Sequence, residues 1–255
     1  MLYRLFTIFF TLCFVNSTYG QPREYQVKID RAYYDVTGDV QRVTDLSGLS
    51  NVDSTVHEFN RKGAKIRTVE YRKYGDQRIT EYTYDDKDRL TYSEGRLFTK
   101  RYFYDQESRI DSMVMIMKGF EGPYRASKFS YPKTGEIQMK TYNNGKLHRF
   151  YLWSYQHDLL QKEAVYRHNS PDNQQITEFV HNEHNQVIKE VEYSSGSTYR
   201  SEDLITYDAN GHVTSKAGDQ FSYEYDQRGN WLKKKTVSRG SATEVTRRVY
   251  YFSNE

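Results

Sequence analysis

A short motif that recurs along the chain constrains its fold more than any other feature of the sequence. The clearest copy runs from Tyr223 to Trp231 and reads aromatic, any residue, aromatic, Asp, two residues, Gly, one residue, apolar. The second aromatic residue of the motif, or its replacement, stands at Phe59, Tyr84, Tyr104, Tyr131, Tyr155, His181, Tyr207 and Tyr225. The spacing has the length of two strands and their turns, so the motif predicts a repeated unit of that size.

Each part of the motif has a structural reason. Two aromatic residues separated by one residue, such as Tyr82 and Tyr84, lie on the same face of an extended strand. The apolar residue after the turn, for example Leu90 or Trp231, begins the return strand. The motif therefore predicts a β-hairpin with a row of aromatic side chains on one face.

The turn itself is encoded by the Asp and the Gly. An Asp side chain accepts hydrogen bonds from backbone N–H groups about two residues on, and Gly takes the positive φ that closes the turn. Where Gly is missing, Asp88 and Asn185 are the residues that best tolerate a left-handed conformation. Ser108 fits this position less well, so we predict mild backbone strain there.

The whole pattern predicts an all-β fold of tandem antiparallel β-hairpins that form one curved, open meander sheet or a partial β-shell. Eight or so hairpins are expected to be too few to close a shell. Further turn signals join the units at residues 143–145, 195–197, 217–219 and 239–241. The one segment that invites a short helical turn is Val40 to Leu49.

The N-terminus resembles a secretory signal peptide. Arg4 provides a positive charge, Leu5 to Val15 is an apolar run too short for a membrane span, and cleavage is expected before Gln21. An alternative is lipid attachment at Cys13, which lacks the small residue that usually precedes such a site. We therefore divide the chain into a signal peptide (1–20), an N-terminal capping segment (21–55) and one domain of hairpins (56–255).

Composition limits the partners and the chemistry. The chain has 37 basic and 34 acidic residues and a net charge of +3, which does not indicate nucleic-acid binding. Its 25 tyrosines and 16% aromatic content are untypical of disordered chains. Cys13 is the single cysteine, so the mature chain would have no disulfide bond and no thiol chemistry.

The run from Tyr223 to Trp231 resembles the YD-repeat, or Rhs-repeat, family, with fair matches around Tyr84, Tyr104 and Tyr207. The resemblance covers most of residues 56–252. It implies a long sheet of hairpins of the kind that spirals into a shell in bacterial toxins and also occurs in animal adhesion proteins. The chain is short and we expect no further domain after Glu255, so toxin delivery is not expected. It is more similar to small secreted YD-repeat proteins of Bacteroidota-type bacteria, for which the family suggests no settled activity.

The best candidate binding residues are Tyr151, Trp153 and Tyr155, three aromatic side chains on one face of a predicted strand. One interpretation is that they form part of the core, because aromatic ladders stabilise a sheet that has few aliphatic residues. The other is that they stay exposed and stack on a flat ligand such as a sugar ring. The sequence leaves both interpretations open.

Local signatures of catalysis and of metal binding are missing. The sequence has no nucleophile elbow, zinc-protease motif, phosphate-binding loop or dinucleotide fingerprint. His181 and His184 lack an obvious third ligand, and Asp85 to Asp88 are explained by the turn. Lys233 to Lys235 with Arg247 and Arg248 predict a basic edge strand, which protects against edge pairing more often than it binds polyanions. We therefore expect no catalytic residue, no metal and no cofactor.

The sequence thus predicts an exported, non-enzymatic scaffold, periplasmic or extracellular, that is not an integral membrane protein. Its expected partner is an envelope protein or a polysaccharide. One alternative is a polysaccharide-binding module that uses the aromatic rows. A less favoured alternative is a hydrolase whose site assembles only in three dimensions.

Overall fold

The computed structural model describes residues 36–47, 52–167 and 169–253. In this part of the chain every regular element is a strand, as the motif predicts. The strands are β1 (Val40–Ser47), β2 (Val52–Phe59), β3 (Lys65–Arg72), β4 (Gln77–Tyr84), β5 (Leu90–Glu94), β6 (Phe98–Tyr104), β7 (Ile110–Met117), β8 (Arg125–Ser130), β9 (Glu136–Asn143), β10 (Lys146–Gln156), β11 (Leu159–Arg167), β12 (Ser170–His181), β13 (Val187–Ser194), β14 (Arg200–Leu204), β15 (Thr206–Tyr207), β16 (Val213–Lys216), β17 (Asp219–Tyr225), β18 (Trp231–Ser238) and β19 (Ser241–Tyr251). None of the described residues belongs to a helix that could cross a membrane.

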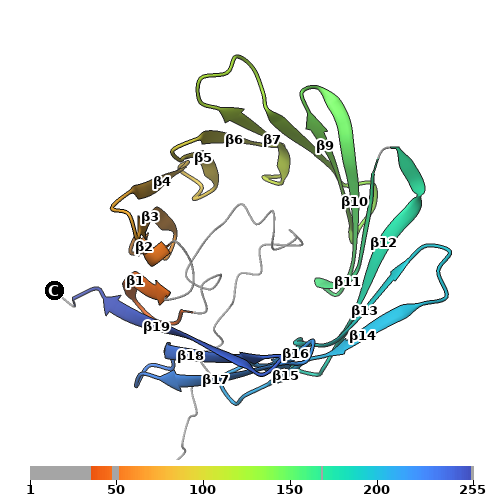
Figure 1. The fold of residues 1–255 in the computed structure, drawn as a ribbon. Coiled ribbons are helices and arrows are strands. Elements are labelled where there is room, and N and C mark those ends of the chain that lie inside the picture. Colours follow the sequence, from red (N-terminus) through yellow and green to blue (C-terminus); the bar gives the residue numbers. More distant parts are fainter. Residues whose placement is uncertain (1–35, 48–51, 168, 254–255) are drawn as a thin grey trace, which may run out of the picture.

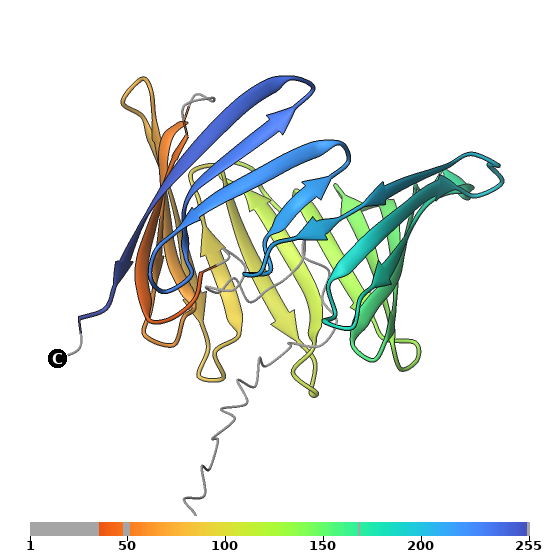
Figure 2. The same ribbon diagram turned by 90° about the horizontal axis from the view of Figure 1, so that it is seen from below.

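The strands form one antiparallel meander that curves into a nearly closed ring (Figure 1). Successive strands pair with each other, and β1 pairs with both β2 and β19, so the two ends of the sheet meet (Figure 2). Among the described strands the meander is interrupted once, between β14 and β15, where Ile205 separates the two strands. The prediction of an all-β curved meander is confirmed, and the sheet curves further round than an open array.

The motif turns form as the sequence predicts. The carboxylate of Asp226 accepts hydrogen bonds from the backbone N–H groups of Arg228 at 2.8 Å and Asn230 at 2.9 Å. Asp85 and Asp208 do the same in their own turns. The Asp side chain therefore satisfies two N–H groups that the tight turn leaves without a backbone partner.

The residue that closes each turn has a positive φ. Gly211 and Gly229 have φ values of 83° and 81°, and Asp88 and Asn185 take the same role at 58° and 62°. Ser108 also has a positive φ, 63°, which confirms that a serine stands where the turn favours Gly.

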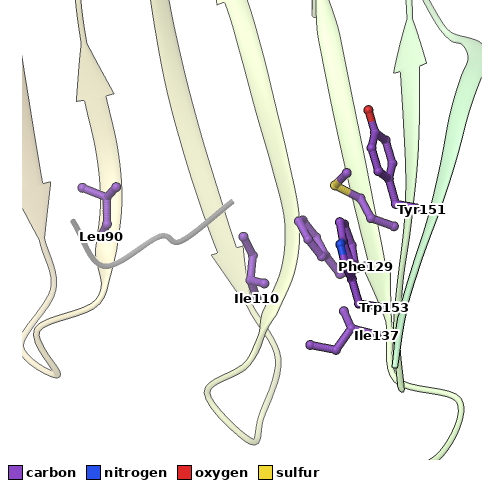
Figure 3. Packing of buried hydrophobic residues seen from close by; sticks show 7 residues of the cluster. Leu90, Ile110, Phe129, Ile137, Tyr151 and Trp153 are labelled. Carbon is purple, nitrogen blue, oxygen red and sulfur yellow. The ribbon is translucent and has the colours of Figure 1, made fainter. Parts of the chain in front are cut away.

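The core lies on the concave face of the sheet, where curvature brings side chains together. One buried cluster spans β5 to β10 and consists of Leu90, Ile110, Phe129, Ile137, Met139, Tyr151 and Trp153 (Figure 3). Half-buried tyrosines of the motif, among them Tyr82 and Tyr84, pack against it, which confirms that the two aromatic residues of a copy share a face. The motif thus supplies both the apolar residues and the aromatic rings that cover them.

In four copies of the motif, a tyrosine hydroxyl group links a hairpin to the hairpin before it. The second aromatic residue of a copy donates a hydrogen bond to the backbone carbonyl of the residue that begins the preceding return strand. This bond is 2.8 Å long in four copies, from Tyr84 to Lys65, Tyr104 to Leu90, Tyr131 to Ile110 and Tyr207 to Val187. A buried phenol needs such a partner, so in these four copies the periodicity of the repeat provides the acceptor for the tyrosine hydroxyl.

The ring is closed by one more copy of the motif, which is divided between the two ends of the array. Tyr251 of β19 pairs with Val40 of β1 across the sheet, just as Tyr225 of β17 pairs with Trp231 of β18 in an ordinary copy of the motif. In the other turns, the backbone N–H of the motif Asp donates to the carbonyl of the fifth residue of the turn, as Asp226 does to Asn230. Here the N–H of Phe252 donates to the carbonyl of Asp39 at 2.9 Å in the same way. The N-terminal side therefore supplies the Gly and apolar part of a turn whose aromatic part comes from the C-terminal side.

Asn230 holds this divided turn in place. Its side chain is fully buried, accepts a hydrogen bond from the N–H of Thr37 and donates to the carbonyl of Thr37 and the hydroxyl of Tyr251. The amide thus bonds both segments that meet at the closure.

The expectation of a helical turn in Val40 to Leu49 is wrong, because residues 40–47 form strand β1. Val40 and Val43 are fully buried and pack with Phe59 on the concave face, and strand pairing on both sides uses the backbone hydrogen bonds. Residues 1–35, which include the predicted signal peptide and the first part of the predicted capping segment, lie outside the described residues.

Candidate functional site: the concave face

The predicted binding row lies on the concave side of β10. The rings of Tyr151 and Trp153 are stacked, with centroids 5.5 Å apart and an angle of 13° between the ring planes. Trp153 is 1% exposed, and its indole N–H donates to the carboxylate of Glu163 on β11. The burial therefore favours the core interpretation for these two rings, and sugar stacking on them stays a prediction.

Tyr155 continues the same strand but follows an irregularity in pairing, where β10 and β11 shift register after Ser154. Its backbone N–H donates to the carbonyl of Gly135 at 2.7 Å. Its hydroxyl is buried and has no hydrogen-bond partner in the part of the chain described, and burial raises the pKa of the phenol. The third member of the row is thus half-buried, with an unsatisfied polar atom.

Basic side chains share the concave face with these aromatic rings. Lys100 lies two residues before Tyr102 on β6, and Arg149 lies two residues before Tyr151 on β10. Arg125 lies on β8, four residues before Phe129. Since side chains alternate along a strand, these even offsets place all three basic groups on the face that carries the core.

Further along this face, two more titratable groups are buried near the closure. Burial, followed by the charge of Lys100, lowers the pKa of Lys65 to about 7. Burial and the charges of Lys65 and Arg247 lower the pKa of His57 to about 3. The ammonium of Lys65 lies 4.3 Å from the ring centroid of Tyr82, which partly offsets the cost of burying it.

The last hairpin is not the basic edge that the sequence suggested. β19 pairs with both β18 and β1, so it has neighbours on both sides. Arg247 is buried, forms an ion pair with Asp45 of β1 and stacks on Trp231 at 3.5 Å. Lys233 contacts two glutamates, and Lys234 lies over two aromatic rings. These charges thus stabilise the closure of the ring and its flanking strands.

A pocket of about 410 Å³ lies between two neighbouring motif turns and the N-terminal end of the closure. Its lining residues are Val36, Thr37, Asn210, Gly211, His212, Arg228 and Gly229. The guanidinium of Arg228 lies over the ring of Tyr251, and Nδ1 of His212 is 3.1 Å from the hydroxyl of Tyr225. Both basic groups of the pocket are therefore engaged by tyrosines of the repeat.

Metal-ligating side chains do not gather in the described residues, where no group of three or more His, Cys, Asp or Glu is placed to hold an ion. Asp85 is used by its turn and by Arg89. His184 lies in the turn after β12 and faces Glu183 at 3.6 Å. The residues that suggested a metal site are thus accounted for by the turns.

The basic residues of the concave face were missed by the sequence analysis, although a signal was present. Lys100 lies two residues before Tyr102, and Arg125 and Arg149 each lie four residues before the first aromatic residue of their copies, so all three are at even offsets. Period-two alternation, which placed Tyr151 and Trp153 on one face, also places these basic residues there. The curvature that brings neighbouring strands together on the inside was not visible in the sequence.

The RHS Repeat family matches residues 207–242, which contain the two turns with complete Asp and Gly positions. No curated protein matches the chain in sequence.

Several solved structures are similar in shape. A porin-like protein from Bacteroides uniformis is 9% identical, with 83% of this chain and 96% of that chain covered and a TM-score of 0.47. A porin-like protein from Bacteroides vulgatus is 12% identical, with 84% and 98% covered and a TM-score of 0.37. A crystal structure that contains TcdB2 and TccC3 is 12% identical, with 79% and 13% covered and a TM-score of 0.39. The YD-repeat resemblance is thus confirmed by the family match: the chain contains an RHS repeat at residues 207–242.

Proposed function

We propose that the chain is an exported, non-enzymatic scaffold of YD repeats that binds a surface partner or an envelope component. The RHS repeat and the all-β fold support the coarser part of this statement, a structural or binding scaffold. The sequence of residues 1–20, with its positive charge and apolar run, supports export.

One observation carries the placement of the binding surface on the concave face. There, aromatic rings and basic side chains lie next to each other on the same strands, as in Lys100 with the half-buried Tyr102 and Arg149 with the buried Tyr151. Ligand sites commonly combine an apolar surface with a few polar groups that fix orientation. The convex face of the same strands shows exposed charges such as Arg101 and Lys128 instead.

The lowered pKa values of the carboxylates in the motif turns support a role without catalysis. Burial disfavours ionisation of Asp208, but hydrogen bonds from the hydroxyl of Tyr225 and from backbone N–H groups outweigh this and lower its pKa. Asp226 is held in the same way by Tyr251 and its own turn. Since a general acid needs a raised pKa near the working pH, these turn carboxylates are suited to structure and not to proton transfer.

The first test addresses export and binding with the same preparation. The full chain is expressed with its leader, and the exported product is purified and its N-terminus determined by mass spectrometry. We expect a mature chain that begins at Gln21. Its melting temperature is then measured with neutral glycans, acidic glycans and solubilised envelope fractions.

Stabilisation by one class of ligand that saturates with concentration supports the binding scaffold. An intact leader on a cell-associated chain would overturn export. A folded sample that none of the three classes stabilises would overturn the binding role.

A further inference from the structure

We propose that the concave face between β6 and β10 is a binding site for an acidic oligosaccharide, with Lys100 and Arg125 as the groups that bind its carboxylates or sulfates. This inference rests on the proposed binding function and specifies the class of ligand. It is carried by the placement of the two cations, by the lack of acidic partners for them and by an unsatisfied buried hydroxyl group beside them.

Strand pairing places the two cations side by side across one intervening strand. Lys100 is opposite Met115, and Met115 is opposite Arg125. Two strand spacings separate their backbones by about 10 Å. Both side chains are long enough to reach one carboxylate between them, and the concave curvature brings their ends closer still.

Neither cation is neutralised within the described residues. No carboxylate lies within ion-pair distance of Lys100 or Arg125 among residues 36–47, 52–167 and 169–253. The guanidinium of Arg125 donates from Nε to the amide oxygen of Asn143 at 3.1 Å. Burial, followed by the charge of Arg125, lowers the pKa of Lys100. An anion between them would relieve this repulsion and restore the charge of the lysine.

Ser127 adds an independent observation. It lies two residues after Arg125 on the same face and is 1% exposed, yet its hydroxyl has no hydrogen-bond partner among the described residues. Thr141, its cross-strand neighbour, is also buried. A buried hydroxyl without a partner is costly, and a polar ligand beside Arg125 would provide one.

The surrounding residues favour a sugar over a simple ion. Tyr102 lies next to Lys100 on β6 and is half-buried, which leaves part of its ring available to pack against a pyranose. Arg149 lies on the same face of β10. On β13 and β14 the concave face carries Glu190 opposite Asp203, and Glu190 forms an ion pair with Lys216 at 2.8 Å, so this side offers an acidic chain no unpaired cation comparable to Lys100.

The test compares charge removal on the two faces of the same strands. One variant carries Lys100→Gln and Arg125→Gln on the concave face. The matched control carries Arg101→Gln and Lys128→Gln, which are exposed on the convex face and change the net charge by the same amount. Binding of an oligogalacturonide, a chondroitin sulfate oligosaccharide, a neutral dextran oligosaccharide and single-stranded DNA is measured by calorimetry for both variants and the wild type.

We expect saturable binding of at least one acidic oligosaccharide that weakens as salt is raised. The concave variant should bind it at least tenfold more weakly, because it loses the two charged groups that donate hydrogen bonds to the anion. The convex control should bind within about twofold of the wild type. The uronate and sulfate probes show which anion the site takes.

Several outcomes would overturn the proposal. Equal loss in both variants, or binding of DNA as tight as that of the glycan, would indicate nonspecific attraction. Binding of dextran alone would overturn the acidic site but leave the proposed binding function standing. If no probe binds and envelope fractions do not stabilise the protein, both the acidic site and the binding function are overturned. Circular dichroism and melting temperature confirm that each variant is folded before binding is interpreted.

Discussion

The motif turn between β17 and β18 and the turn that closes the ring have the same geometry but different covalent structure. In the first, Tyr225 to Trp231 is one continuous segment. In the second, Tyr251 and Phe252 come from the C-terminal end, while Gly38 to Val40 come from the N-terminal end. The backbone bond across each turn is 2.9 Å, from Asp226 to Asn230 and from Phe252 to Asp39.

The difference lies in how the inner N–H groups are satisfied. In the continuous turn Asp226 accepts from the N–H of Arg228, two residues on. Phe252 occupies the Asp position in the divided turn and has no side-chain acceptor. The N–H of Thr37, which is the equivalent of the N–H of Arg228, donates to the side chain of Asn230 instead. A neighbouring copy therefore provides the acceptor that the divided copy lacks.

The closure also meets a different entropic requirement. A continuous turn brings together residues four apart, whereas the bond from Thr37 to Asn230 joins positions separated by 193 residues. Loop-closure entropy increases with the length of the loop, so the divided turn needs additional contacts to form. The buried Asn230, the Arg247–Asp45 ion pair and the packing of Val40 and Val43 provide these contacts.

The largest expected effect is that of Asn230→Ala. It removes four hydrogen bonds at the closure and leaves buried polar groups unsatisfied, so we expect a loss of about 3 kcal/mol in the free energy of unfolding. Gln186→Ala is the matched control, since Gln186 has the equivalent position in an intact turn and bonds only within that turn. It should lose about 1 kcal/mol or less. Equal losses in urea titrations would show that the closure is no more demanding than an ordinary turn.

Lys65→Leu should stabilise the protein by about 2 kcal/mol near pH 6. Lys65 occupies the position that is Leu90 or Ile110 in other copies, and it is 3% exposed. Its pKa is about 7 in the folded chain and 10.5 ordinarily, so between these values the unfolded chain holds a proton that the folded chain lacks. Wild-type stability therefore rises with pH across this window, and the full penalty applies below pH 7.

The advantage of Lys65→Leu should accordingly decrease from pH 7 towards pH 10. The measurement is denaturant unfolding of both proteins at a series of pH values. A wild type whose stability is flat between pH 7 and 10, or a variant that is less stable than the wild type at pH 6, would contradict the lowered pKa.

Gly38→Ala and Gly229→Ala test whether the divided turn adopts the conformation of a continuous one. The two glycines have φ values of 79° and 81°, and no atom lies within 4 Å of an added Cβ at either position. Each substitution should cost about 1 kcal/mol through backbone strain alone. If Gly38→Ala leaves the melting temperature unchanged while Gly229→Ala lowers it, the divided turn does not hold its left-handed residue.

The smallest expected effect is a gain of about 0.5 kcal/mol from Ser108→Gly, because Gly adopts the observed φ of 63° without the steric penalty of a side chain. The increased freedom of the unfolded chain offsets part of the gain. Thermal unfolding against the wild type measures it, with Ser112→Gly in a strand as a control that should destabilise. A decrease in stability for Ser108→Gly would show that the serine is not strained.

Most of the hairpin architecture could be predicted from the sequence, and the candidate site could be predicted only in part. The turns at Asp208 and Asp226 and the shared face of Tyr82 and Tyr84 follow from interactions within a few residues. The role of Val40 to Ser47 was mispredicted because its strand conformation depends on β19, which is distant in sequence. Trp153 could be placed on a face, but its burial depends on Glu163 and on the curvature of the sheet.

The sequence by itself determined the unit of this protein: a hairpin whose Asp, Gly and aromatic residues satisfy their hydrogen bonds within the unit or with the adjacent one. Those interactions are local, so they can be read from spacing. Only the tertiary structure decided that the array curves until β1 meets β19, that Asn230 completes a turn made from both chain ends, and that Lys100 and Arg125 share a surface. These features depend on curvature added up over all the strands, which no single repeat encodes.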